Sequence, residues 1–414
     1  MNKYYAGGAR TDITPPLGVP YLSFKPRHEA FRGVHDPLFA TAAVISDGDH
    51  TVAIVSADGI GFNNDLLGAN IHFTTYVRKL ISSRCPIKNE NILIASSHIH
   101  STPDTIFSRM INKDDFPCMQ SWFKIIAEKI ADIVALAQSS MKEASLSCRN
   151  SVIDGVSVNR RGGAAIDNSL TTLMFSLEDA RKIIISHFAC HPVIVQAQPY
   201  CSADFPGVMR TTVEKAMPES VFLFLQGCCG DINPIMGDTG SFDDVRAIGL
   251  ALGGEIISQA GLLEISKCKN EPAVVDCVSK SIVLRSKELP KGEDAAKFKD
   301  NADAMLRLSE GEPDYLSEIQ IIRLGNSLIL CIEGEPFCEM GVALKHRLEK
   351  DYVCLPTGYA NGYLGYICPP AAFEQGGYEP GTKGSLGPWS IVGPGAFSEI
   401  INGLCDLAKK INVN

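Results

Sequence analysis

Histidines at the ends of apolar runs are the residues of this sequence most suited to chemistry. His98 and His100 follow the run 91–95, and His191 follows the run 182–185. In open α/β sheets, ligands collect outside the carboxyl ends of strands. In an extended backbone, side chains two residues apart point to the same side, so His98 and His100 can reach one pocket. These three imidazoles are therefore candidates for a shared site.

Carboxylates follow two further apolar runs. The run 221–225 continues into a segment with Asp231, and the run 328–332 continues into Glu333 and Glu335. A His-x-His pair with a distant histidine and a carboxylate is a recurring ligand set of catalytic zinc, which keeps one position for water. The pattern predicts such a site. The histidines without this setting are expected to have surface or structural roles: His28, His35, His50, His72 and His346.

The adjacent thiols of Cys228 and Cys229 offer a different chemistry. A nucleophilic cysteine needs a lowered pKa, which a helix N-terminus or a nearby base can supply, and the flanking glycines permit such a turn. Small cysteines that pack a tight turn are the alternative, and composition favours it. The thiol route predicts inactivation by alkylation, whereas the zinc route predicts inactivation by chelators.

Alternating strands and helices must position these groups. The pattern predicts one α/β unit, a single large domain with a mixed β-sheet core flanked by helices. The opening segment 7–18 is expected to be a short strand that ends in a proline-fixed turn. Further strands are expected at 39–46, 51–56, 91–95, 170–176, 182–188, 221–225, 273–284 and 319–332, the last a hairpin turning at Gly325-Asn326. The run 91–95 is expected to be a central strand because it is short and mostly apolar. Helices are expected at 64–82, 122–137, 242–259 and 396–411, with a peripheral helical excursion at about 287–310. The segment 355–397, rich in glycine, proline and aromatic residues, is expected to be an active-site loop.

Composition and charge exclude several classes of protein. The 414 residues (44.7 kDa) are 45% hydrophobic and 21% charged, which excludes disordered, coiled-coil and collagen-like chains. A net charge of −9 argues against a nucleic-acid partner. Apolar runs are too short for a transmembrane segment, and the N-terminus lacks an apolar signal core. Fourteen cysteines without framework spacing predict free thiols and a cytoplasmic protein, with a secreted form trimmed of its signal as the alternative.

Short motifs stand in order along nearly the whole chain. They are Ala9-Arg-Thr-Asp-Ile-Thr-Pro-Pro, Asp36-Pro-Leu-Phe-Ala-Thr-Ala, Val55-Ser-Ala-Asp58, Ser97-His-Ile-His-Ser-Thr-Pro, Val158-Asn-Arg160, Phe188-Ala-Cys-His-Pro192, Gly334-Glu-Pro-Phe, Asn361-Gly-Tyr-Leu-Gly-Tyr366 and Tyr378-Glu379. Together they resemble the N-terminal catalytic domain of the neutral/alkaline non-lysosomal ceramidases. The resemblance implies that residues 1–414 form one ceramidase-like catalytic domain, without the C-terminal β-sandwich domain of full-length ceramidases.

The resemblance also implies roles for individual residues. Zn²⁺ would be held by His98, His191, Glu335 and Tyr366, with water completing the shell. His100 would be the acid/base next to the metal, and Arg160 and Tyr378 would donate hydrogen bonds near the scissile carbonyl. One motif departs from the family, since Asn233 stands where ceramidases carry a serine of the active site. An amide is not a nucleophile, but it can still hydrogen-bond substrate.

These inferences predict a zinc-dependent hydrolase that cleaves a linear amide (N-acyl) bond by attack of metal-bound water. The departure at Asn233 favours a small or polar substrate over ceramide. An esterase or lactonase on the same site is one alternative, because the sequence does not separate the two leaving groups. A non-catalytic protein that keeps the metal pocket for recognition is another. The expected partner is a small-molecule amide or ester, and a homo-oligomer is compatible with the sequence.

Overall fold

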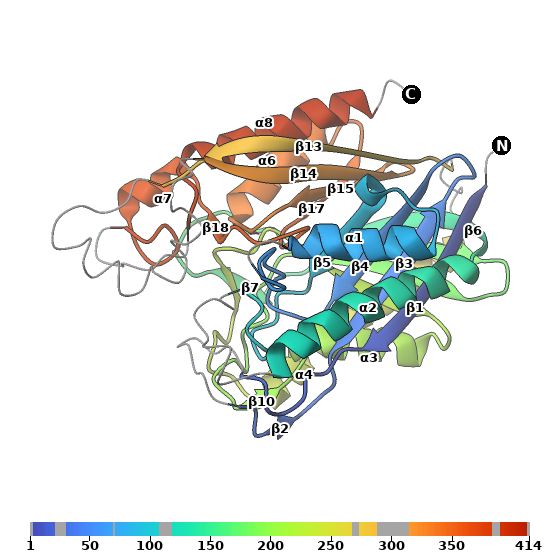
Figure 1. The fold of residues 1–414 in the computed structure, drawn as a ribbon, viewed down its shortest axis with the longest axis horizontal. Helices are drawn as coiled ribbons and strands as arrows, with labels where there is room; N and C mark the ends of the chain where they lie inside the picture. Colours follow the sequence, from blue (N-terminus) through green and yellow to red (C-terminus); the bar gives the residue numbers. More distant parts are fainter. Residues whose placement is uncertain are drawn as a thin grey trace.

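The computed structural model describes residues 3–20, 30–68, 71–106, 118–266, 273–287, 314–382 and 390–411. Two sheets organise this part of the chain (Figure 1). The expected helical excursion at about 287–310 lies outside the described residues, apart from Lys287, and so does His28.

The larger sheet has eight strands in the order β11-β9-β8-β6-β1-β3-β4-β5. Their bounds are β1 Tyr4–Asp12, β3 Phe39–Ser46, β4 Thr51–Ala57, β5 Ile92–Ser96, β6 Lys142–Val152, β8 Ser169–Leu177, β9 Lys182–Phe188 and β11 Val221–Gln226. The pairs β4–β5 and β9–β11 are parallel and the others are antiparallel, so the sheet is mixed, as expected. The predicted hairpin of β3 and β4 and the predicted pair β8–β9 are confirmed.

The smaller sheet has four strands in the order β13-β14-β15-β17. Their bounds are β13 Val275–Arg285, β14 Asp314–Leu324, β15 Ser327–Ile332 and β17 Val353–Thr357. The predicted hairpin at Gly325-Asn326 is confirmed by the pair β14–β15. Three short two-stranded pairs complete the sheets: β2 Gly33–Val34 with β10 Tyr200–Cys201, β7 Ser157–Asn159 with β12 Ile232–Pro234, and β16 Glu335–Pro336 with β18 Tyr366–Ile367.

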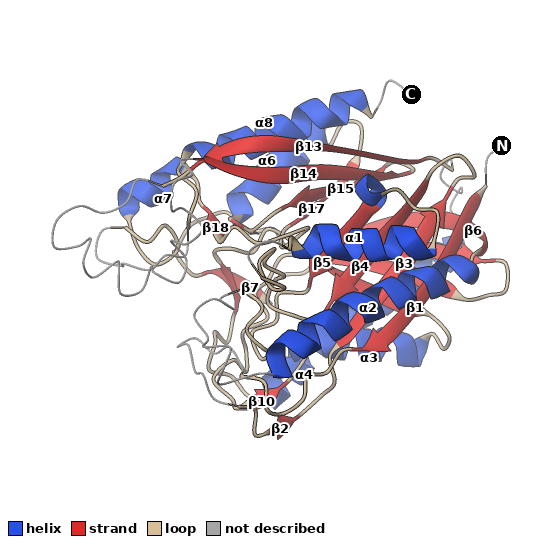
Figure 2. Cartoon of the chain, viewed as in Figure 1, coloured by secondary structure: helices blue, strands red, loops and turns tan. Residues whose placement is uncertain are grey.

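The two sheets pack face to face, with helices on both outer sides (Figure 2). Ile54 and Leu93 of the larger sheet share one buried cluster with Ile322 and Ile329 of the smaller sheet. The helices on the larger sheet are α1 Phe73–Arg84, α2 Cys118–Ser139, α3 Asp204–Ala216 and α4 Phe242–Ser266. Those on the smaller sheet are α6 Cys338–Leu348 and α8 Gly395–Lys410. The short helix α7 Pro370–Gln375 and the 3₁₀ turn η1 Asn89–Asn91 lie in connections. Strands covered on both faces read as continuous apolar runs, which explains the pattern of the sequence.

The prediction that the run 91–95 is a central strand is wrong, because β5 lies at the edge of the larger sheet. The loop after β17 covers this edge. Ala95 forms a bridge with Ala360, and the backbone N–H of Asn361 donates to the carbonyl of Ile94 (2.8 Å). The backbone N–H of Ile94 donates in turn to Asn361 Oδ1 (3.0 Å). The strand is apolar because tertiary contacts bury it, and the site loop is thereby fixed to the strand that precedes His98.

The helix predictions differ from the structure in two ways: one helix begins later than expected, and two helices were not predicted. The helix expected at 64–82 begins only at Phe73, after Asn64 Oδ1 accepts a hydrogen bond from the Thr74 N–H (3.0 Å) and His72 caps the first turn. No sequence pattern predicted β6, α3 or α6.

The small residues of α4 allow close packing, as expected. A Cβ at Gly249 would lie 2.4 Å from the Cβ of Val208 on α3, and a Cβ at Gly253 would lie 3.0 Å from the Cβ of Thr212. By length and composition alone α4 could also cross a membrane. Val245, Leu252 and other residues of α4 are buried against the larger sheet and α3, which is the pattern of a core helix.

Asp204 at the start of α3 predicts a pH dependence of stability. Its carboxylate is buried and accepts hydrogen bonds from the N–H groups of Phe205 (2.7 Å) and Val195 (3.4 Å), yet burial raises its pKa to about 7. The folded protein then binds this proton more tightly than the unfolded chain. The contribution of Asp204 to the free energy of unfolding is therefore fully present below the ordinary pKa of 3.8 and is lost as pH rises through about 7.

We expect this loss to reach about 4 kcal/mol at neutral pH, since one pKa unit corresponds to about 1.4 kcal/mol. Asp204→Asn, which resembles the protonated acid, should remove that share of the slope. Urea unfolding of both proteins at acidic and alkaline pH measures the difference. Identical slopes for the two proteins would contradict the assignment.

Candidate active site

The predicted site residues come from separate strand ends that the two sheets bring together. His98 and His100 follow β5, and His191 follows β9. Glu335 lies in β16, where the parallel pairing with β18 places it directly beside Tyr366. All of these side chains except that of His100 are buried. The clustering expected from the sequence is thus present.

Three histidines and one carboxylate form the centre of the site. Glu335 Oε2 lies 3.3 Å from His98 Nε2 and 3.4 Å from His191 Nε2. His100 Nε2 is 3.3 Å from His98 Nε2, and the ligand atoms of the three histidines lie within 4.8 Å of one another. Although both are buried, His191 Nε2 and Glu335 Oε2 have no hydrogen-bond partner within the described residues. Orphaned nitrogen and oxygen donors that converge in this way fit a divalent cation such as zinc.

Hydrogen bonds to the backbone fix which nitrogen each histidine presents. Nδ1 of His98 pairs with the carbonyl of Ile60, and Nδ1 of His191 pairs with the carbonyl of Ile232 (3.1 Å). A carbonyl only accepts, so Nδ1 carries the proton and Nε2 keeps its lone pair. This is the arrangement by which proteins orient metal-binding histidines. The ring of Tyr359 stacks on His98, with 3.8 Å between ring centroids, and holds it from the other side.

The backbone at His98 differs from the extended conformation expected for His-x-His. His98 has φ +62°, in the left-handed region, which a residue with a side chain seldom adopts. The two imidazoles still meet, with their rings at 87° and the centroids 4.9 Å apart. The two imidazoles thus meet at one site, although of the two only His100 lines the pocket, and a tight turn and not strand alternation brings them together.

The local electrostatics suit ligation. Burial lowers the pKa of His191 to about 4, and burial together with His98 and His191 lowers the pKa of His100 well below its usual value. Burial alone would raise the pKa of Glu335, but His98 and His191 outweigh it and hold that pKa well below the usual range. At neutral pH His100 and His191 are neutral and the Glu335 carboxylate is ionised, which are the forms that bind metal.

Tyr363 orients the carboxylate. Its hydroxyl donates to Glu335 Oε1, which leaves Oε2 facing His98 and His191. We expect Tyr363→Phe to weaken metal affinity, activity or both by about 10- to 100-fold, as is typical when a group behind a metal ligand is lost. Metal competition with a chromophoric chelator measures the affinity. Because phenylalanine keeps the buried ring, an unchanged affinity and rate would show that the hydroxyl has no orienting role.

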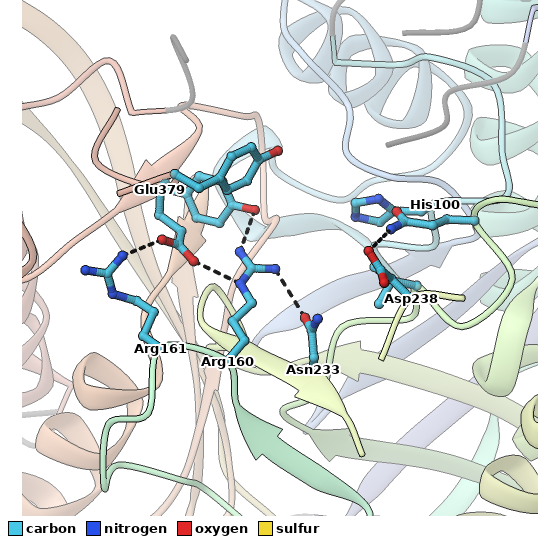
Figure 3. A pocket seen from close by; sticks show the side chains of 10 residues that line it. His100, Arg160, Arg161, Asn233, Asp238 and Glu379 are labelled. Atoms are coloured by element: carbon cyan, nitrogen blue, oxygen red, sulfur yellow. Dashed lines mark hydrogen bonds and ion pairs between the residues drawn. The ribbon is translucent and has the colours of Figure 1, made fainter. Parts of the chain in front are cut away.

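A pocket of about 470 Å³ opens next to this centre (Figure 3). Its lining residues are His100, Arg160, Arg161, Val193, Gln196, Asn233, Asp238, Tyr366, Tyr378 and Glu379. Cavities of a few hundred cubic ångströms suit small ligands, so substrate would reach the histidine cluster from this side.

Arg160 is held in the pocket wall by four hydrogen bonds. Nε donates to Glu379 Oε1 (2.9 Å), Nη1 to Asn233 Oδ1 (3.2 Å), and Nη2 to the carbonyl of Gly230 (2.8 Å) and to the Tyr366 hydroxyl (3.0 Å). Burial opposes its charge, but Tyr366 and Glu379 outweigh burial and raise the pKa of Arg160 further. The guanidinium is therefore a fixed positive charge beside the phenol of Tyr366. Burial raises the pKa of Tyr366 itself well above the usual value.

The eight residues predicted for the site all lie at this centre or line its pocket: His98, His100, Arg160, His191, Asn233, Glu335, Tyr366 and Tyr378. The thiol alternative is contradicted. Cys228 and Cys229 are buried, burial raises both thiol pKa values well above the usual range, and Cys229 Sγ lies 3.1 Å from the Tyr359 hydroxyl. The cysteines of the described part of the chain are all free thiols, as expected.

Sequence reasoning missed several residues of the site: Arg161, Gln196, Asp238, Tyr359, Tyr363 and the role of Glu379. Tyr359, Tyr363 and Glu379 fall in the segment 355–397, whose composition predicted an active-site loop. No local signal pointed to Gln196 or Asp238. The remaining histidines among the described residues are structural or at the surface: His187 Nε2 pairs with the carbonyl of Pro356 (2.9 Å), His72 caps α1, and His35, His50 and His346 are exposed.

Comparison with known proteins agrees with this picture. The family model for the N-terminal domain of neutral/alkaline non-lysosomal ceramidases matches residues 4–244. A neutral ceramidase of Drosophila melanogaster is 22% identical over 168 residues, which are 40% of this chain and 23% of the fly protein. The chain thus spans about a quarter of that relative.

The crystal structure of neutral ceramidase from Pseudomonas aeruginosa superimposes with a TM-score of 0.79 at 18% identity, covering 99% of this chain and 74% of that chain. A ceramidase complexed with C2 gives a TM-score of 0.79 at 16% identity, covering 100% of this chain and 76% of that one. The expected fold is confirmed.

Proposed function

Because the chain belongs to the neutral/alkaline non-lysosomal ceramidase family, we propose that it is a zinc-dependent hydrolase that cleaves a linear N-acyl amide bond. The observation that carries the proposal is the buried cluster of His98, His191 and Glu335 beside a pocket, in which His191 Nε2 and Glu335 Oε2 converge without hydrogen-bond partners. A buried imidazole nitrogen and a buried carboxylate oxygen without hydrogen-bond partners, His191 Nε2 and Glu335 Oε2, cost folding free energy unless a cation occupies the space between them.

The residues that would hold zinc are His98, His191, Glu335 and Tyr366. When bound, zinc would supply a Lewis acid that polarises the scissile carbonyl and lowers the pKa of water. Arg160 supports the tyrosine, since its guanidinium already donates to the hydroxyl that would become a phenolate.

The chain's own groups would handle the proton and the oxyanion. His100 is the pocket-facing imidazole and is neutral at pH 7, so it can take a proton from the attacking water and pass it to the leaving amine. Arg160 and Tyr378 face the same space and can donate to the carbonyl oxygen as its negative charge develops. The amide oxygen of Asn233 is engaged by Arg160 Nη1 (3.2 Å), which leaves the NH₂ group of Asn233 to donate to substrate.

The pocket supports a small or polar substrate. Six of the ten residues that line it have charged or amide side chains, and Val193 and the rings of Tyr366 and Tyr378 add apolar surface. Asn233 also removes the hydroxyl that the family's ceramidases carry at this place in the motif. An N-acyl amide with a short or polar acyl group needs no further apolar channel, whereas a two-chain lipid would.

Hydrolysis of matched probes tests the proposed function. An amide, an ester and a lactone with the same short acyl group are compared with a ceramide, each with and without a chelator. We expect the amide to be cleaved faster than the ceramide, and all cleavage to stop when the metal is removed. Cleavage of the ester or lactone alone would favour the esterase or lactonase alternative. Metal binding without any turnover would favour a recognition protein.

A further inference from the structure

Gln196 lines the pocket and carries a buried acceptor without a hydrogen-bond partner. Its side chain is 2% exposed and lines the pocket, and Oε1 has no hydrogen-bond partner within the described residues. Its Nε2 donates to Asp238 Oδ2 (3.0 Å), another lining residue. Because a carboxylate oxygen only accepts, this bond fixes the orientation of the amide and identifies Oε1 as the orphan. A buried acceptor without a hydrogen-bond partner lowers the stability of the folded protein, and a hydrogen bond donated by a ligand would offset that loss.

The two loops that carry this pair are built to hold it. Gln196 follows His191 by five residues, and its backbone N–H donates to the carbonyl of Val193 (3.2 Å) in a tight turn. Asp238 follows a turn in which the Gly237 N–H donates to the carbonyl of Pro234 (2.8 Å), with Gly237 at φ +74°. The Gln196–Asp238 pair is therefore fixed to the same loop as His191 and to the strand β12 that carries Asn233.

The pocket is polarised between two groups of side chains (Figure 3). On one side, Arg160 and Arg161 both donate to Glu379 (2.9 and 2.6 Å), so this group carries an excess positive charge and many N–H donors. Near His100, the Gln196–Asp238 pair offers an amide oxygen and a carboxylate. A substrate whose carbonyl turns toward Arg160 would thus bring another of its groups against acceptors.

We propose that Gln196 and Asp238 form a specificity subsite for a hydrogen-bond donor of the substrate, a hydroxyl or an ammonium group. This rests on the proposed hydrolase function and narrows its substrates to N-acyl amides that carry such a group. Gln196 Oε1 accepts the donor, and the charge of Asp238 favours an ammonium over a hydroxyl. An apolar group would leave Oε1 unpaired, and a carboxylate would be repelled by Asp238.

Matched probes test the subsite. They are N-hexanoyl derivatives of ethylenediamine, ethanolamine, propylamine and glycine, which place an ammonium, a hydroxyl, a methyl or a carboxylate at one position of the amine. A second series places the same groups on the acyl chain. Binding is measured by calorimetry on ketone isosteres, in which CH₂ replaces the amide NH, and kcat/KM is measured on the amides. In one of the two series we expect the hydroxyl to bind about 10-fold and the ammonium about 100-fold more tightly than the methyl.

Two variants and a control separate the contributions. Gln196→Met keeps the volume but removes the acceptor, and it should reduce the advantage of the hydroxyl over the methyl to less than about 3-fold. Asp238→Asn should remove the advantage of the ammonium over the hydroxyl. Asp243→Asn removes the same charge from an exposed side chain nearby (89% accessible) and should leave all ratios unchanged. The methyl probe should bind all four proteins alike, which verifies that the variants fold.

The outcomes distinguish this inference from the proposed function. Equal binding of the methyl and donor probes in both series, or a preference that survives both substitutions, overturns the subsite. A donor preference lost in the variants supports the subsite even if no amide is hydrolysed. In that case it is the proposed hydrolase function that fails.

Discussion

Replacing His191 with alanine is expected to abolish stoichiometric zinc binding and to lower kcat/KM for amide hydrolysis by at least about 10³-fold. Nε2 of His191 is one of the two unpartnered atoms at the centre and lies 3.4 Å from Glu335 Oε2. Loss of the metal forfeits several kcal/mol of transition-state stabilisation, and each 1.4 kcal/mol is a tenfold change in rate. Elemental analysis of the purified variant and steady-state kinetics measure the two effects.

His346→Ala is the matched control for this substitution. His346 lies on the exposed face of α6, away from the cluster, so its loss should change neither the zinc content nor the rate. A His191→Ala protein that is folded, free of metal and as active as the wild type would contradict the account. So would a variant that retains one zinc per chain.

Arg160→Lys is expected to lower kcat by about 10²- to 10³-fold, with a smaller change in KM. Lysine keeps the charge, but a single ammonium does not reproduce the planar fork that contacts Glu379, Asn233, Gly230 and Tyr366 together. A fixed donor aimed at a developing oxyanion contributes about this factor in other acyl-transfer sites. Initial rates over a range of substrate concentrations separate kcat from KM.

Arg161→Lys gives the comparison. Arg161 shares Glu379 with Arg160, but its other bonds go to Gln375 and the carbonyl of Gly376, outside the proposed chemistry. We expect its kcat to fall less than about 10-fold. Equal losses in the two variants would mean that the arginines act only by holding Glu379 and the loop around it.

The fold was largely predictable from hydrophobic patterning, because strands that are buried on both faces appear in the sequence as short continuous apolar runs. β3, β4, β8, β9 and the β14–β15 hairpin lie where the sequence placed them. The errors arose where tertiary contacts decide the outcome. β5 is apolar because the loop at Asn361 covers it, not because it is central. The helix expected from residue 64 begins only at Phe73, where Asn64 Oδ1 accepts a hydrogen bond from the Thr74 N–H.

The site residues that could be predicted from the sequence are those whose residue type suits metal binding and which follow the end of an apolar strand. His98, His191 and Glu335 each follow an apolar run, and the structure brings them within 3.4 Å contacts. Gln196 and Asp238 gave no signal, because an unpartnered amide oxygen exists only once the loops have folded against each other. The left-handed backbone conformation of His98 was not predicted either, because an extended backbone already accounted for two imidazoles that point to the same side.

The central claim is that one zinc at the histidine–glutamate cluster is required for amide hydrolysis. The most direct test is a zinc titration of protein stripped with a chelator, with bound metal and hydrolysis of a short N-acyl amide followed together. The account predicts that the rate rises in proportion to occupancy and levels off at one zinc per chain, and that His191→Ala shows neither binding nor activity. Full amide hydrolysis by the metal-free protein, or a rate indifferent to zinc occupancy, would contradict it.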